Sequence, residues 1–194
     1  MKTLFVVITV VVLLVGGIVG VAYSGVLDVS ATAKEPDLIG WLLRTSRERS
    51  VERRAADISV PDLSAETKVA NGAKAFGEMC AGCHGAPGRE PFTGAQDMNP
   101  APPDLAKVAE ASKPAELFWV IKHGIRMTGM PAWGQTHSDE QLWDLVAFVE
   151  RLPSISVAEY QDLAQRGSTH GHDHEHGGLA GSGPEPHEHG AHGH

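Results

Sequence analysis

Two cysteines and a histidine lie within five residues of one another, in the segment Cys80-Ala81-Gly82-Cys83-His84. Two thiols at this spacing can both add to the vinyl groups of one porphyrin, and an imidazole directly after them then lies under the iron. The chain has two cysteines in all, so no thiol remains for a disulfide framework or for a second pair of zinc ligands. The segment therefore indicates covalent attachment of one haem. A redox dithiol and half of a zinc site are the alternatives.

A second axial ligand for the iron is expected from Met130. This methionine precedes Pro131 in a stretch where Gly and Pro break regular structure, so its thioether should be presented on a loop. A His/Met pair is a common ligand set for haem iron in electron transfer, and the soft thioether raises the reduction potential. Met127 is the alternative ligand, ranked second because no proline stiffens the backbone beside it. Met79 and Met98 are expected to pack or to lie on the surface.

Between residues 61 and 153 the chain resembles the class I c-type cytochromes. Gly72 and Phe76 are spaced four apart on an expected first helix, one turn before the first haem cysteine, so they share a face of that helix. In the family, a glycine and an aromatic at these positions form the crossing with the last helix. The resemblance makes Leu145 and Phe148 the expected partners in that crossing.

The last helix of this domain is expected over residues 138–152. Ser138 and Gln141 have the spacing of a capping box. Apolar residues follow at helical spacing: Leu142, Leu145 and Phe148. A middle helix fits residues 115–124, and its apolar side consists of Leu117, Phe118, Val120 and Ile121.

The supporting residues of the haem site follow from the same resemblance. Residues 85–103, dense in Gly and Pro, should form an irregular loop around the haem edge. Pro103 is the expected acceptor of the proton on the far nitrogen of the haem histidine, and Pro102 is the alternative by one residue. Trp133 matches the aromatic that packs on the porphyrin and donates to a propionate, and Arg126 is a second candidate for the propionates.

An uncharged apolar run over residues 4–22 is long enough to cross a hydrocarbon layer of about 30 Å. A secretory signal has a shorter apolar stretch, so residues 1–24 are interpreted as a retained anchor, with signal cleavage at 22–24 or 31–33 as the alternative. Lys2 precedes the run and no other basic residue follows before Lys34, which predicts a cytoplasmic amino end. The haem domain is then expected on the periplasmic, outer face of the cytoplasmic membrane, on a single-pass protein.

The linker, residues 25–60, carries a segment that can form an amphipathic helix. Its apolar residues are Leu38, Ile39, Trp41, Leu42, Leu43, Val51, Ala55 and Ile58, and its basic residues are Arg44, Arg47, Arg49, Arg53 and Arg54. Two interpretations remain open. The helix lies on the lipid surface, or it packs against the domain or a neighbouring subunit.

The last segment, residues 167–194, is a low-complexity tail that cannot bury a core and is expected to be disordered. It contains eight histidines: His170, His172, His174, His176, His187, His189, His192 and His194. Interspersed imidazoles on a flexible chain suit zinc, copper or nickel, so the tail is either a weak metal buffer or a solubilising extension.

The whole sequence thus predicts an all-α protein. A small class I cytochrome c fold with one haem c occupies residues 61–166, after a single transmembrane helix and before the tail. The formal net charge of −8 leaves no basic footprint for nucleic acid. With both axial positions filled, no coordination site is open for a small-molecule substrate.

We therefore expect a one-electron carrier and not an enzyme, working between redox protein donors and acceptors in a membrane-associated respiratory or dehydrogenase chain. The expected docking surface is the rim around residues 129–133 and the loop after His84. The alternatives are an integral haem subunit of a dehydrogenase or terminal oxidase complex, and an enzyme or gas sensor with a labile Met bond.

Overall fold

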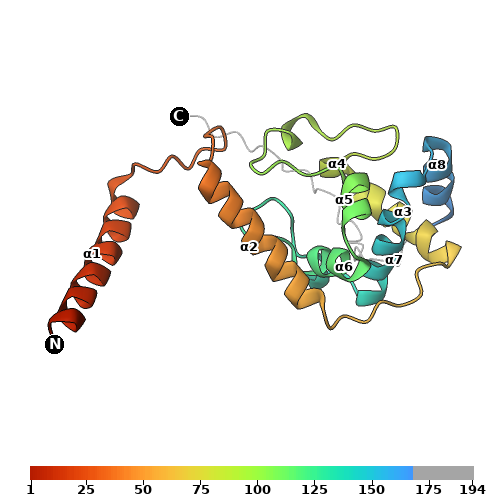
Figure 1. The fold of residues 1–194 in the computed structure, drawn as a ribbon. Helices are drawn as coiled ribbons and strands as arrows, with labels where there is room; N and C mark the ends of the chain where they lie inside the picture. Colours follow the sequence, from red (N-terminus) through yellow and green to blue (C-terminus); the bar gives the residue numbers. More distant parts are fainter. Residues whose placement is uncertain (168–194) are drawn as a thin grey trace, which may run out of the picture.

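The computed structural model describes residues 1–167, and in this part of the chain the regular secondary structure is helical (Figure 1). The expected all-α architecture is confirmed. The elements in chain order are α1 (Lys2–Ser24), α2 (Asp37–Ala55), α3 (Glu66–Met79), α4 (Ala81–His84), η1 (Thr93–Ala95), α5 (Leu105–Ala111), α6 (Pro114–His123), η2 (Trp133–Gln135), α7 (Asp139–Val149), η3 (Leu152–Ser154) and α8 (Val157–Arg166). The tail histidines, from His170 to His194, lie outside the described residues.

Helix α3 crosses helix α7 at Gly72, where the two backbones meet. A Cβ atom on Gly72 would collide with the main-chain carbonyl of Asp144 and would lie 2.9 Å from Cβ of Phe148. The Phe76 ring, one turn on, packs against the Phe148 ring with centroids 5.1 Å apart. The expected crossing through Gly72, Phe76 and Phe148 is therefore confirmed, and Leu145 is buried in the same core.

A buried carboxylate lies beside this crossing. Asp144 is 3% exposed, and among the described residues it is the one buried charged side chain. Its carboxylate lies 3.5 Å from Nζ of Lys68 and accepts a hydrogen bond of 3.2 Å from the amide of Asn71. Because a buried charge without partners is costly, these contacts tie α7 to α3 across the same face that Gly72 opens.

Helix α7 begins where the sequence predicts. Ser138 accepts from the main-chain N–H of Gln141, and the Gln141 side chain accepts from the Ser138 N–H, so the capping box is confirmed. The helix ends at Val149, three residues earlier than expected, and the chain continues through a turn into η3. The middle helix, α6, is confirmed within one residue of its expected bounds, with Leu117, Phe118 and Ile121 buried.

Two helices were not foreseen as separate elements. Helix α5 directly follows Asp104, whose carboxylate accepts from the Ala106 N–H at 3.0 Å. Helix α8 is capped by Ser156, which accepts from the Glu159 N–H, and it packs on α3 with Leu163 fully buried. Gly167, assigned to the tail from sequence, is instead buried in close contact with the carbonyl of Ala70.

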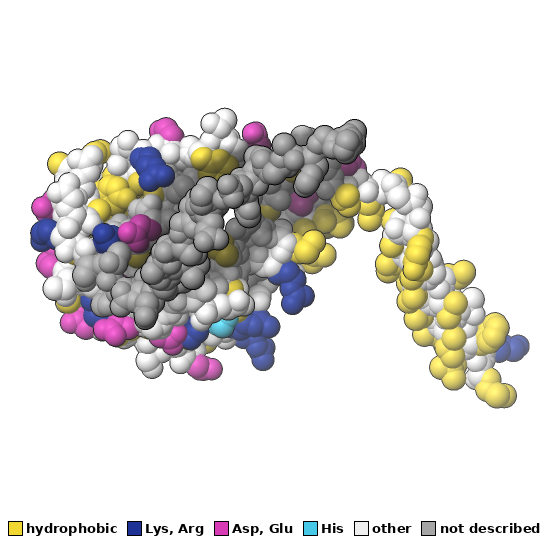
Figure 2. Space-filling view, turned by 180° about the vertical axis from the view of Figure 1, so that it is seen from behind, with side chains coloured by type: hydrophobic (Ala, Val, Ile, Leu, Met, Phe, Trp, Pro, Cys, Tyr) yellow, Lys and Arg dark blue, Asp and Glu magenta, His cyan; other side chains and the backbone are white. Residues whose placement is uncertain are grey.

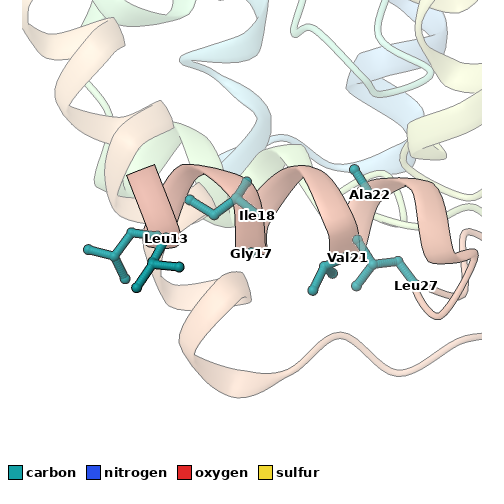
Figure 3. A pocket seen from close by; sticks show the side chains of 7 residues that line it. Leu13, Gly17, Ile18, Val21, Ala22 and Leu27 are labelled. Carbon is teal, nitrogen blue, oxygen red and sulfur yellow. The ribbon is translucent and has the colours of Figure 1, made fainter. Parts of the chain in front are cut away.

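Helix α1 is long and apolar enough to cross a membrane, and its candidate span is 0% buried. Figure 1 shows it apart from the globular part of the chain. A shallow apolar groove runs along its surface (Figure 3), lined by Leu13, Leu14, Gly17, Ile18, Val21, Ala22 and Leu27. The groove is formed by α1 and by Leu27, three residues beyond its end, so it takes no part in the site described below.

Helix α2, the expected amphipathic helix, is confirmed as a helix and packs against α6. Its carboxyl-terminal end supplies the contact surface, because Ala55 is buried and Val51 is half-buried. Ile58, just beyond the helix, packs against the hydrophobic core. The two interpretations of this segment are thus not exclusive, since one end of α2 lies on the domain.

Candidate haem site

The cysteines and the histidine lie on the short turn of helix that follows α3. The N–H of Cys80 donates to the Phe76 carbonyl at 2.9 Å, which extends α3 up to the first thiol. Cys80 in turn accepts from the N–H groups of Cys83 at 3.1 Å and of His84 at 3.0 Å. This turn places both thiols and the imidazole next to one another at the end of α3, whose other side is fixed by the crossing with α7.

The two thiols differ in their environments. Cys80 is 9% exposed and Cys83 is half-buried, and both are free in the structure. Burial, and to a smaller extent the neighbouring Cys83, raises the pKa of the Cys80 thiol to about 12. Cys80 thus lies in the hydrophobic core, where burial disfavours the thiolate that a reactive redox dithiol needs.

His84 is oriented by a hydrogen bond from another part of the chain. Its Nδ1 lies 2.9 Å from the carbonyl oxygen of Pro103. A carbonyl can only accept, so the proton of the neutral ring is on Nδ1 and the lone pair is on Nε2. Of the two prolines considered from sequence, Pro103 and not Pro102 makes this contact.

The loop between His84 and Pro103 is folded back onto the helical turn. Gly85 has a φ of 75°, a left-handed conformation that turns the chain directly after the imidazole. Ala86 and Arg89 exchange two main-chain hydrogen bonds of 2.8 Å, and the Phe92 N–H donates to the Gly82 carbonyl at 2.9 Å. The segment is largely irregular, as expected, with η1 as its one short helix.

Met130 lies on a tight loop between α6 and η2. Its N–H donates to the Thr128 hydroxyl at 3.1 Å, and that hydroxyl donates to the Ile125 carbonyl at 2.8 Å. The Met130 carbonyl accepts from the Ile125 N–H at 3.3 Å. Gly124 has a φ of 64°, and a Cβ atom there would lie 2.7 Å from the Met130 carbonyl oxygen. These contacts fix the backbone that carries the thioether.

The burial of the candidate methionines separates them. Met130 is half-buried and packs against the core, whereas Met127 is 90% exposed and has a φ of 62° at the tip of the loop. Met98, expected to be packing or surface, brings its sulfur close to Gly129, because a Cβ atom there would lie 3.2 Å from that sulfur. The loop between His84 and Pro103, called the haem loop below, therefore meets the loop between α6 and η2 that carries Met130, called the Met130 loop.

Trp133 and Arg126, the expected supporting residues of the haem site, lie close to Met130 in the chain. Trp133 begins η2 and is half-buried against the core. Its ring makes an edge contact with the His137 ring, with the ring centroids 5.6 Å apart. Arg126 is exposed on the Met130 loop. Both lie on the same loop region as the expected axial methionine, and their roles toward a porphyrin stay predictions.

The residues present fit a covalently held haem. Two free, adjacent thiols, an imidazole with its Nε2 lone pair available, and a half-buried thioether form the donor set that this group requires. Within residues 1–167, no group of three or more His, Cys, Asp or Glu side chains could hold a metal ion.

Comparison with known proteins agrees with this geometry. Residues 67–149 match the family model described as cytochrome c oxidase, cbb3-type, subunit III. The match covers the helices from α3 to α7 together with both loops. The chain therefore contains a class I c-type cytochrome domain, with haem c as its cofactor and a haem-based role in electron transfer. No curated protein and no solved structure matches the chain.

Three residues of the site were missed from sequence. Thr128 and Gly124 shape the Met130 loop, and Asp144 holds the helix crossing. Thr128, two residues before Met130, has the spacing of a hydroxyl turn, and Gly124 is the last residue of the predicted middle helix, so both gave a local signal. Asp144 gave none, because a carboxylate on a helix is usually solvated.

Proposed function

We propose that this protein is a one-electron carrier whose haem c is held by Cys80 and Cys83 through thioether bonds. His84 and Met130 would be the two ligands that the chain supplies to its iron. Trp133, with Arg126 and Pro103, completes the surroundings of the group. In this proposal the protein performs no covalent chemistry on a substrate, because its own side chains fill both axial positions.

The hydrogen bond between His84 and Pro103 is the observation that carries the proposal. By accepting the proton on Nδ1, the Pro103 carbonyl leaves the Nε2 lone pair available to bind a metal and fixes the orientation of the ring. A histidine on a helix surface needs no such bond. The presence of this bond at His84, one residue after Cys83, supports a role of His84 as a metal ligand that must keep one orientation.

When bound, haem supplies reversible exchange of a single electron between ferrous and ferric iron. The residues of the chain set the conditions of that exchange. Met130 presents a soft sulfur that favours the ferrous state, while the Thr128 and Ile125 hydrogen bonds limit movement of the loop between the two states. The buried Cys80 side excludes water from one edge of the site.

A second candidate function is a fixed haem subunit of a terminal oxidase complex. The description of the matching family model, which names subunit III of a cbb3-type cytochrome c oxidase, favours it. Both candidates transfer electrons through the same site, and they differ in whether the partner is transient. Donors and acceptors are redox proteins in either case.

We also propose that α1 is a retained anchor in the cytoplasmic membrane and that the haem domain lies on its periplasmic face. Lys2 before the apolar run and the absence of further basic residues up to Lys34 support this orientation. For the tail, zinc, copper or nickel binding by its eight histidines is proposed from composition alone.

Solubilisation of native membranes in a mild detergent, followed by size separation with detection of covalent haem, tests these proposals. A free carrier migrates near the mass of its own 20.6 kDa chain plus detergent. If the chain instead co-migrates with the activity of an oxidase that contains copper and haem, the proposal of a free carrier gives way to that of a fixed oxidase subunit. A haem stain that disappears from the denatured chain would contradict covalent attachment and the function with it.

A further inference from the structure

The first two turns of α2 expose large apolar side chains to the surroundings. Trp41 is 58% exposed and Leu42 is 50% exposed, and their neighbours have similar values: Leu38 70%, Ile39 45% and Leu43 56%. Figure 2 shows these hydrophobic side chains gathered where the globular part meets the segment leading to α1. A soluble surface rarely carries so many large apolar residues together without a partner.

Arginines occupy the turns of α2 that directly follow. The helix contains five of them against three acidic residues, in a chain whose formal net charge is −8. Arg49 pairs with Glu52 at 2.9 Å and Arg47 lies 3.8 Å from Glu48, so part of the positive charge is balanced within the helix. The remaining arginines are Arg44, directly after the apolar end, and Arg53 and Arg54 in the last turn, so the helix keeps an excess of positive charge. Lys and Arg side chains appear as a group beyond the apolar end in Figure 2.

The linker holds this end of α2 at a short distance from the end of α1. The Asn99 amide, on the haem loop, donates to the carbonyl oxygens of Ala31 at 3.2 Å and of Ala33 at 3.4 Å. The seven-residue advance from Ser24, the last residue of α1, to Ala31 spans at most about 25 Å at roughly 3.6 Å per residue. If α1 spans the bilayer, the haem loop and the start of α2 cannot move far from its surface.

We propose that residues 38–43 of α2 insert into the interfacial layer of the bilayer and that the arginines after them contact anionic lipid headgroups. This inference rests on the proposed anchoring by α1. An aromatic residue and several leucines, followed by basic residues, are typical of helices that bind at the membrane–water interface. The opposite end of α2 lies on the domain through Ala55 and Val51, so the inserted end does not compete with the packing on α6.

This second contact fixes how the haem domain faces the membrane. A tether alone would let the domain rotate, whereas α1 and the start of α2 together define an orientation. The haem loop, through Asn99, lies on the linker side of the domain. The geometry therefore fits an electron-transfer partner that is itself embedded in the same membrane and presents its site close to the lipid surface.

Spin labelling of the full-length holoprotein tests the insertion. Cys80 and Cys83 are blocked by the haem, so a label attaches only to a new cysteine, either Leu42→Cys on α2 or Val157→Cys on α8. Val157 is 45% exposed and serves as the matched control. Both proteins are reconstituted into vesicles of phosphatidylcholine with phosphatidylglycerol and into vesicles of phosphatidylcholine alone. Relaxation by oxygen, which concentrates in lipid, is compared with relaxation by a water-soluble nickel chelate.

The proposal predicts an oxygen-to-nickel ratio for the Leu42 label that is several times that of the Val157 label, with the larger difference in the anionic vesicles. Arg44→Gln combined with Arg53→Gln should reduce that lipid dependence while leaving the haem spectrum unchanged. A Leu42 label as accessible to nickel as the control would overturn the insertion. A Leu42 label protected from both relaxants would show that a protein neighbour, and not lipid, covers this end of α2. Release of the protein from vesicles by high salt would instead contradict the anchor itself.

Discussion

A single proton decides which nitrogen of His84 can serve as a ligand. The Pro103 carbonyl at 2.9 Å from Nδ1 keeps that proton in place, and it does so from a segment 19 residues further along the chain. Met130 is held in a comparable way, through the Thr128 hydroxyl and the Ile125 main chain. Hydrogen bonds therefore fix the ring of His84 and the backbone that carries Met130, the two side chains proposed as ligands.

The Met130→Ala variant should keep its haem covalently attached, because both thioether bonds are untouched. Loss of the thioether should lower the reduction potential and open a coordination site for an added ligand such as imidazole. Absorption spectra of the oxidised protein and a potentiometric titration measure both effects. The matched control is Met127→Ala, which removes the same side chain from a position that is 90% exposed on the same loop. If the control loses the Met–iron band and Met130→Ala keeps it, the axial assignment is wrong.

Removal of the Thr128 hydroxyl should weaken the hold on Met130 without changing the ligand. Thr128→Val keeps the side-chain shape and deletes the hydrogen bonds to the Met130 N–H and the Ile125 carbonyl, at a cost of about 1 kcal/mol each. We expect the Met–iron band to disappear at a lower temperature on heating. Thr67→Val, at an exposed position of α3, is the control. Equal midpoints for the two variants would show that the hydroxyl does not support the loop.

Among the elements, the crossing of α3 with α7 positions the turn that carries Cys80, Cys83 and His84. Gly72→Ala adds one Cβ atom against the Asp144 carbonyl, a backbone group that cannot move aside without shifting α7. We expect a loss of about 1 to 3 kcal/mol in the free energy of unfolding, measured by chemical denaturation. In Gly77→Ala, on the same helix, the new Cβ meets only the tip of Tyr160 at 3.0 Å.

The Gly77 control should gain up to about 1 kcal/mol, because alanine is the better helix former, provided that the Tyr160 hydroxyl moves aside. The comparison therefore separates helix propensity from the close approach of the backbones. Similar stabilities for Gly72→Ala and Gly77→Ala would place the crossing elsewhere on α3.

The sequence predicted this arrangement in the places where local patterns are strong. The cysteine and histidine spacing, the capping box at Ser138 and the spacing of Gly72 and Phe76 each follow from short-range rules. Helix α8 was missed although Ser156 and Glu159 have a capping spacing and Val157, Tyr160 and Leu163 recur at helical spacing, because it lies beyond residue 153, where the resemblance to the family ended. The Asp144 contacts join residues more than 70 positions apart, and no periodicity could indicate them.

At the scale of the whole molecule, α1 and α2 precede the haem domain and the His-rich segment follows it. Helix α2 touches it through α6, and Gly167 closes it against α3, so its boundary lies slightly beyond the residue expected from sequence. A fragment covering residues 59–167, exported with a separate signal, should be soluble, bind haem and retain its Met ligand. The matched full-length chain should stay with the membrane at high salt, because an apolar span is not screened by ions.

Fractionation of cells that produce either form measures this difference. A fragment that fails to incorporate haem would show that α2 is part of the haem fold and not an accessory. A full-length protein released by salt, or an amino terminus mapped near Gly25, would show that α1 is removed and does not anchor the chain.

The most direct test of the proposed carrier is a redox titration of the purified full-length protein, followed through its absorption spectrum. We expect one reversible one-electron step, covalent haem, a Met–iron band in the oxidised form, and no binding of carbon monoxide to the reduced form. A reduced protein that binds carbon monoxide readily would reveal an open or labile sixth position. That result would contradict a carrier whose iron is closed by His84 and Met130.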